Sequence, residues 1–121
     1  MARHNDVGRD GEQQAAEYLQ AQGFRLLERN WHAPHSRHEL DIIAQGEGRL
    51  VIVEVKTRTA LTHGSPLEAV DWKKVRAMAS AAQAYVRMTA TDLPLRFDVI
   101  SIAAGELEHI RAAFVPPAKH Y

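Results

Sequence analysis

Residues 38–58 constrain the fold of this chain most strongly, because they combine two apolar strand patterns with charged side chains. Two runs rich in β-branched residues, 42–44 and 50–55, flank a short connection that contains Gly46 and Gly48. Apolar, β-branched runs separated by glycines predict two strands joined by a tight turn. We therefore expect an antiparallel β-hairpin in this part of the chain.

Four charged residues interrupt these apolar strands, namely Glu39, Asp41, Glu54 and Lys56. Such side chains are almost never buried unless they are paired or bind a metal. Because successive side chains in a strand point to opposite faces, Glu39 and Asp41 share one face of the first strand. Glu54 and Lys56 likewise share one face of the second strand. A hairpin that turns at 46–48 then brings Asp41 close to Glu54 at its open end.

Length and composition predict one domain over residues 1–121, because 121 residues with 45% hydrophobic content are sufficient for a single core. The chain has no cysteine, which argues against disulfides and thiolate chemistry and favours a reducing compartment. Its polar start resembles no signal segment, and no apolar run could cross a bilayer. We expect a cytoplasmic protein without a membrane partner, with flexible ends at 1–5 and 116–121.

Hydrophobic periodicity and turn residues predict the remaining elements. They are, in chain order, a helix over 8–22, a strand over 24–31, the hairpin, a helical region over 65–88, and strands over 95–102 and 107–115. Ser65 and Glu68 form a capping box at the start of the helical region, and Asp71 and Trp72 can divide it in two. This order predicts an α/β domain with a mixed sheet flanked by helices, in which the helical crossover makes one strand pair parallel.

Glu12 lies on the inward face of the first helix, in phase with Ala15 and Leu19. A carboxylate in the first turn has an ordinary explanation, since it complements the helix dipole by roughly 0.3 to 1 kcal/mol. The charged hairpin supplies a second explanation. Glu12 would then be a third acid, beside Asp41 and Glu54.

Converging acids require a positive group, because two unit charges about 4 Å apart repel by roughly 4 kcal/mol at an effective dielectric near 20. Lys56 and a divalent cation are the two candidates. Oxygen ligands without cysteine favour Mg²⁺ or Mn²⁺ over zinc. The metal explains the whole set of acids best, so we expect a site for Mg²⁺ or Mn²⁺ at the open end of the hairpin.

Two other interpretations involve the same region. Glu54 and Lys56 could form an exposed ion pair worth roughly 0 to 1 kcal/mol, but this leaves the other acids unexplained. His32, His35 and His38 could suggest a zinc site. Their segment has little helical character, so the three imidazoles need not converge.

Basic residues are clustered although the formal net charge is zero, a balance that is unusual for a nucleic-acid binder. Arg37 precedes the acids and Arg58 follows them. Lys73, Lys74 and Arg76 lie in the first turns of the second helical segment, where the helix dipole disfavours cations. Either a phosphate-bearing partner such as DNA or a solvated helix face accounts for these cations.

The motif formed by Asp41, twelve intervening residues and Glu54-Val55-Lys56 resembles the D…E-x-K signature of the PD-(D/E)xK nucleases, the restriction-endonuclease-like superfamily. Nearly the whole chain resembles the bacterial YraN-like family, which is usually compared with archaeal Holliday-junction resolvases. The segments that carry this resemblance are Gly8-x-x-Gly11-Glu12-x-x-Ala15-x-x-Tyr18-Leu19, Glu39-Leu40-Asp41-Ile42-Ile43, Val53-Glu54-Val55-Lys56-x-Arg58 and Arg96-Phe97-Asp98-Val99. The chain has Leu40 where the superfamily has proline, and His38 where the narrower family usually has glycine.

The resemblance implies a restriction-endonuclease-like fold and an endonuclease that uses Mg²⁺ or Mn²⁺ to hydrolyse DNA, including branched or junction DNA. It implies that Asp41, Glu54 and the main-chain carbonyl of Val55 ligate the metal. Glu12 would complete or tune the site. Lys56 would orient the attacking water and stabilise charge on the phosphoryl group.

Two alternatives to a nuclease remain open at this point. One is a non-catalytic nucleic-acid-binding module that keeps the fold, and the other is a structural domain whose acids form ion pairs. The intact Asp41, Glu54 and Lys56 favour the enzyme over the binding module. Symmetric cutting of a junction would require two subunits, and the sequence leaves open whether two copies associate as a homodimer.

Overall fold

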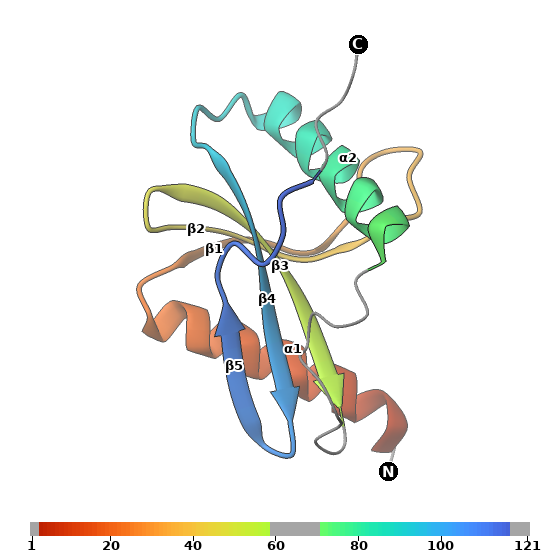
Figure 1. Cartoon of the computed structure of the whole chain (residues 1–121), viewed down its shortest axis with the longest axis vertical. Helices are drawn as coiled ribbons and strands as arrows, with labels where there is room; N and C mark the ends of the chain where they lie inside the picture. Colours follow the sequence, from red (N-terminus) through yellow and green to blue (C-terminus); the bar gives the residue numbers. More distant parts are fainter. Residues whose placement is uncertain (1–2, 59–70, 117–121) are drawn as a thin grey trace.

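A computed structural model of the chain describes residues 3–58 and 71–116, and it has the element order expected from the sequence (Figure 1). The elements are helix α1 (Arg3–Ala21), strands β1 (Arg25–Trp31), β2 (Leu40–Gly46) and β3 (Arg49–Arg58), helix α2 (Trp72–Thr89), and strands β4 (Leu95–Ala103) and β5 (Glu106–Ile110). The predicted capping box at Ser65 and Glu68 lies outside the described residues. Residues 1–2 and 117–121, parts of the predicted flexible ends, also lie outside them.

The five strands form one mixed sheet in the order β1-β2-β3-β4-β5. β2 and β3 pair antiparallel, so the predicted hairpin is confirmed. β3 and β4 pair in parallel, while β1 and β5 pair antiparallel with their neighbours. The parallel pair follows from the crossover that contains α2. The α/β class is thus confirmed, and the architecture is consistent with a restriction-endonuclease-like fold.

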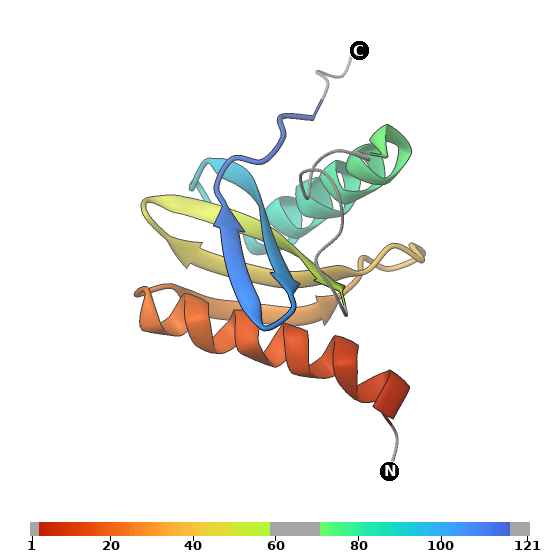
Figure 2. The same cartoon turned by 60° about the horizontal axis from the view of Figure 1, so that its bottom comes forward.

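The sheet lies between the two helices, with α1 against one face and α2 against the other (Figure 2). On the α1 face, the helix buries Ala15, Ala16 and Leu19 against β-branched residues that include Val51 and Val53. The opposite face receives the apolar stripe of α2. The main residues of this second cluster are Met78, Ala82 and Tyr85 of α2, with Ile43, Ile52 and Phe97 of the sheet. Neither described helix is long and apolar enough to span a membrane.

Helix α2 begins at Trp72, where the sequence predicted a break in the helical region, and the shorter helix expected before the break lies outside the described residues. Asp71 has an extended conformation and its side chain accepts hydrogen bonds from the main-chain N–H groups of Lys73 and Lys74, at 3.0 and 3.3 Å. This is the geometry of an N-cap, in which a side-chain oxygen satisfies N–H groups that the helix leaves unpaired. The cap fixes the point at which α2 begins.

Two predicted boundaries are wrong. α1 begins at Arg3 rather than near Gly8, because a single glycine weakens a helix without ending it. β5 ends at Ile110 rather than continuing to residue 115. After β5 the main chain of Ala112 has a φ of 50°, and its N–H donates to an Asp98 carboxylate oxygen at 3.0 Å. The regular pairing of β5 with β4 ends here, although the N–H of Ala113 still donates to the Phe97 carbonyl of β4 at 2.8 Å.

Candidate metal centre

Asp41 and Glu54 lie at neighbouring positions where the β2–β3 hairpin opens. In the hairpin register Ile42 pairs with Val53, so the next residue outward on each strand is Asp41 or Glu54. The Asp41 carboxylate accepts a hydrogen bond from the N–H of Val55 at 2.9 Å. The acid of β2 is therefore held directly against the strand that carries the second acid.

Burial raises the pKa of Asp41 from an ordinary value of 3.8 to about 6. The N–H of Val55 opposes this rise, whereas the negative charges of Glu54 and Glu12 add to it. The positive charge of Lys74 acts in the opposite sense. Asp41 thus lies within the electric field of groups from β3 and from both helices.

Glu54 is a buried carboxylate, with only 6% of its surface exposed. It forms an ion pair with Lys74, in the first turn of α2, whose side chain is 47% exposed. Burial acts to lower the pKa of Lys74, but the hydrogen bond and charge of Glu54 reverse the effect and the pKa is raised. The interpretation of Glu54 as a member of an exposed pair is therefore wrong, because the sheet and α2 cover it.

Glu12 approaches this region from α1. The residue is partly buried, and its carboxylate accepts an exposed hydrogen bond from the side-chain amide of Asn30 in β1, at 3.2 Å. Its charge also raises the pKa of Asp41. The structure consequently places Glu12 close enough to influence Asp41, while its hydrogen bond joins it to β1.

Lys56 and Val55 follow Glu54 along β3. Lys56 is partly buried and lies beside Ser101 in the parallel ladder with β4. Strand alternation places it on the same face as Glu54. Val55 packs at the edge of the α1-side core, and its N–H is engaged by Asp41.

His38 is the histidine of the 32–38 segment that faces the acids. Its Nε2 is buried and has no hydrogen-bond partner. Burial lowers the pKa of His38. The negative charge of Glu54 acts to raise this pKa, and the positive charge of Lys74 acts to lower it. His32 and His35 are exposed. Throughout residues 3–58 and 71–116, no three or more His, Asp or Glu side chains form a group that could hold a metal, so the histidine zinc site is not formed there.

The donor chemistry at the hairpin opening nevertheless fits a hard divalent cation. Mg²⁺ is usually bound by one or two carboxylates, with waters and substrate phosphates as the other ligands. Asp41 and Glu54 supply two carboxylates, and the pKa of Asp41 is raised mainly by burial, with the negative charges of Glu54 and Glu12 adding to the rise. A cluster of three protein carboxylates is therefore not required.

The predicted nucleic-acid-binding residues are divided among three segments. Arg37 is exposed between β1 and β2, and Lys73 and Arg76 are exposed on α2. Arg58 is partly buried at the end of β3, and Lys74 contacts Glu54. The segment between β1 and β2 and the first turns of α2 lie on the same side of the molecule (Figures 1 and 2).

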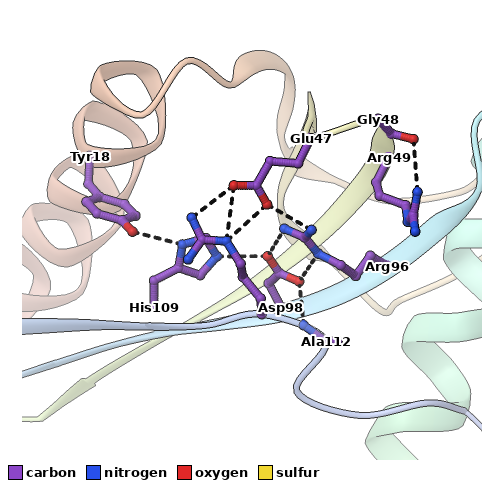
Figure 3. Close-up of polar contacts among 9 residues, drawn as sticks. Tyr18, Glu47, Gly48, Arg49, Arg96, Asp98, His109 and Ala112 are labelled. Carbon is purple, nitrogen blue, oxygen red and sulfur yellow. Dashed lines mark hydrogen bonds and ion pairs between the residues drawn. The ribbon is translucent and has the colours of Figure 1, made fainter.

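A second polar cluster, centred on Asp98, was not anticipated from the sequence (Figure 3). Asp98 is fully buried in β4 and accepts hydrogen bonds from the Arg96 guanidinium and from Nε2 of His109, all at 2.8 Å. Nδ1 of His109 lies 3.0 Å from the Tyr18 hydroxyl of α1. Arg96 also contacts Glu47 in the β2–β3 turn, at 2.9 Å.

A signal for this cluster was present in the strand pattern. Arg96 and Asp98 alternate with Phe97 and Val99 in an otherwise apolar strand, so a charged pair had to lie on one face of β4. The partner residue His109 could not be identified in this way, since it comes from a different strand. The Asp98 cluster lies on the α1 side of the sheet, joined to that helix through Tyr18.

The sequence is similar to those of other bacterial proteins over almost its whole length. A profile of the uncharacterised protein family UPF0102 matches residues 11–102. A UPF0102 protein of Parabacteroides distasonis is 47% identical over 123 residues, which cover 98% of this chain and 100% of that protein. A UPF0102 protein of Porphyromonas gingivalis is 47% identical over 120 residues, which cover 94% of this chain and 87% of that protein. A UPF0102 protein of Flavobacterium psychrophilum is 42% identical over 118 residues, which cover 94% of this chain and 98% of that protein.

Proposed function

Because this chain belongs to the uncharacterised protein family UPF0102, we propose its function from the chemistry of its own residues. We propose a cytoplasmic Mg²⁺-dependent endonuclease that hydrolyses phosphodiester bonds of DNA, with branched or junction DNA as the substrate class. The observation that supports it most is the approach of Asp41 to Glu54 at the opening of the hairpin, where the pKa of Asp41 rises to about 6. Membership of the PD-(D/E)xK superfamily is part of the same proposal.

Each residue of the candidate centre has a role in this proposal. Asp41 and Glu54 would hold the cation together with the main-chain carbonyl of Val55, and Glu12 would adjust the charge of the site from α1. When bound, Mg²⁺ supplies a nucleophile at neutral pH and compensates charge on the phosphoryl group. Lys56 would orient the attacking water and stabilise that charge from the neighbouring position on β3.

DNA would be bound locally rather than by the charge of the whole protein, since the formal net charge is zero. Arg37, Lys73 and Arg76 are exposed, belong to segments that lie on the same side of the molecule (Figures 1 and 2), and could each neutralise a phosphate. Affinity should therefore fall as salt rises, with a slope set by the number of contacts. Two copies of the chain would be needed for symmetric cutting of a junction.

The direct test is a cleavage assay on linear, flapped and four-way DNA with Mg²⁺, with Mn²⁺ and with a chelator. The wild-type protein should cut with either metal and not with chelator. Asp41→Asn and Lys56→Ala should each lower the rate by at least roughly 100-fold, because each removes a group needed in the reaction. Glu106→Gln, at an exposed position in β5, is the matched control and should cut normally. Undiminished cleavage by both site variants would contradict the proposed site.

A non-catalytic DNA-binding module is the second candidate. The observation that favours it is the ion pair of Glu54 with Lys74, which already neutralises one of the two acids. This alternative predicts salt-sensitive binding to the same DNA panel without any cleavage in Mg²⁺ or Mn²⁺. Cleavage by the wild-type protein that is lost in Asp41→Asn would eliminate it.

A further inference from the structure

The two partners of the ion pair between Lys74 and Glu54 differ in their exposure to solvent. Glu54 belongs to the central strand β3 and is 6% exposed, whereas the Lys74 side chain is 47% exposed. Lys74 reaches the acid from the first turn of α2. Its ammonium can therefore move into solvent without opening the core.

Lys74 is the positive group that the structure places against the candidate metal ligands from α2. Its charge acts on Glu54, Asp41 and His38 together. A buried carboxylate with no counter-charge is strongly destabilising, so an ammonium at this place compensates Glu54 when no metal is present. The neighbouring Lys73 is exposed, and its side chain has no such contact among the described residues.

The helix dipole favours departure of this ammonium. Lys74 lies in the first turn of α2, where the partial positive charge of the N-terminus repels cations. The acidic cap Asp71 binds the main-chain N–H of Lys74 and so fixes its backbone, leaving the long side chain as the part that moves. What holds the ammonium in place is the charge of the acids, and a divalent cation bound to those acids would remove that attraction.

We propose that Lys74 is an exchangeable counter-cation, which neutralises Glu54 in the metal-free protein, is displaced when Mg²⁺ or Mn²⁺ binds, and then contacts a phosphate oxygen of bound DNA. The proposal rests on the proposed function and assigns to Lys74 a role in metal affinity and substrate positioning. The ammonium and the metal compete for the same Glu54 carboxylate. A DNA phosphate beside the metal restores an anionic partner to the released lysine, next to exposed Lys73 and Arg76.

The first measurement is calorimetric titration of chelator-treated protein with Mn²⁺. Lys74→Met should bind Mn²⁺ about 10-fold more tightly than wild type, because the competitor is gone and the acids are uncompensated. Lys73→Met, one residue away on the same helix, should bind within about 2-fold of wild type. If Lys74→Met does not fold in chelator, Lys74→Gln, which retains a hydrogen-bond donor without the charge, replaces it in the titration.

The outcomes separate this inference from the proposed function. Equal Mn²⁺ affinity in wild type and in the Lys74 variant would overturn the exchange, although the metal site itself would stand. Absence of Mn²⁺ binding in both proteins would overturn the metal site and the inference with it. Tighter binding in Lys74→Met, with Lys73→Met unchanged, is the supporting result.

The second measurement tests the contact with phosphate in Lys56→Ala protein, which is expected to bind DNA without cutting it. In this background Lys74→Met should weaken binding of four-way DNA several-fold with Mn²⁺ present and have little effect in chelator. The slope of log affinity against log salt should become shallower by about 0.9 only with Mn²⁺, as for the loss of one phosphate contact. An equal effect of Lys74→Met with and without metal would contradict the release of Lys74 by the metal.

Discussion

Asp41 is a residue whose charge opposes the stability of the fold. Its pKa in the folded protein is about 6, against an ordinary 3.8, because the carboxyl is buried and lies near Glu54 and Glu12. A carboxyl with a raised pKa stabilises the folded state fully below pH about 4, when it is protonated in both states. That contribution is lost as the pH rises through about 6. The charged form of Asp41 thus lowers the stability of the fold at neutral pH.

Asp41→Asn should therefore stabilise the metal-free protein at pH 7.5. The amide oxygen can still accept from the N–H of Val55, and the unfavourable charge is absent. Two pKa units correspond to at most about 3 kcal/mol in the free energy of unfolding, and the gain should vanish near pH 4. Urea denaturation at both pH values in chelator measures it. Asp92→Asn, at an exposed position before β4, should change stability by less than about 0.5 kcal/mol. A loss of stability in Asp41→Asn at pH 7.5 would contradict the assigned pKa.

At the scale of elements, the position of α1 depends on its close approach to β3. Gly11 is buried, and a Cβ at this position would overlap Cγ2 of Thr57 and lie 3.1 Å from its Oγ1. The missing side chain lets the helix axis come near the end of the strand. Glu12, the next residue, is thereby brought within range of Asp41, so the packing of two elements sets the charge of the candidate site.

Gly11→Ala should destabilise the protein although alanine is the better helix former by about 1 kcal/mol. The overlap with the stiff, β-branched Thr57 should outweigh this gain, with a net loss of roughly 1 to 3 kcal/mol. A double-mutant cycle with Thr57→Ser, which removes the overlapped methyl group, checks the cause by chemical denaturation. Most of the loss should disappear in the Thr57→Ser background. An equal loss in both backgrounds would place the cause elsewhere.

At the scale of the whole molecule, the Asp98 cluster connects parts of the chain that lie far apart in sequence. Asp98 and Arg96 belong to β4, His109 to β5, Tyr18 to α1 and Glu47 to the β2–β3 turn. Burial alone would raise the pKa of Asp98, but hydrogen bonds from His109, Arg96 and the N–H of Ala112 lower it. The carboxylate is therefore ionised at neutral pH and is the common acceptor of the cluster.

Asp98→Asn should lower the free energy of unfolding at pH 7 by about 3 to 5 kcal/mol, since it leaves buried cationic and donor groups without their charge partner. A carboxyl whose pKa is lower in the folded than in the unfolded protein stabilises the fold at pH values above its unfolded pKa, which is near 4. This stabilisation is lost as the pH falls below that unfolded pKa and through the lower pKa of the folded state. The difference between wild type and variant should consequently narrow between pH 5 and pH 3 in denaturation experiments. This pH dependence is opposite in direction to that of Asp41.

Metal binding provides the control for the Asp98 variant. Asp98 lies in a different cluster from the candidate centre, so folded Asp98→Asn should bind Mn²⁺ with wild-type affinity, measured well below its melting temperature. A parallel loss of Mn²⁺ affinity would mean that the two clusters are coupled. If Mn²⁺ affinity is unchanged in Asp98→Asn, the Asp98 cluster supports the fold and does not take part in metal binding.

The sequence alone determined the order of the elements, the hairpin and the positions of Asp41 and Glu54 on it. These features follow from local rules, since side-chain alternation and turn residues operate over a few neighbouring positions. The register that brings Asp41 next to Glu54 could be derived because only a short turn separates the two strands. The inward face of α1 was likewise encoded by its own periodicity.

Only the tertiary structure decided which charges meet across elements. Lys74 contacts Glu54, His38 places an unpartnered Nε2 beside them, and Tyr18 meets His109 across 91 positions of sequence. Each contact depends on how a helix or connecting segment packs on the sheet, and no local pattern specifies that distance or rotation. The sequence could therefore predict two acids in need of a cation, whereas packing determined that Lys74 of α2 contacts Glu54.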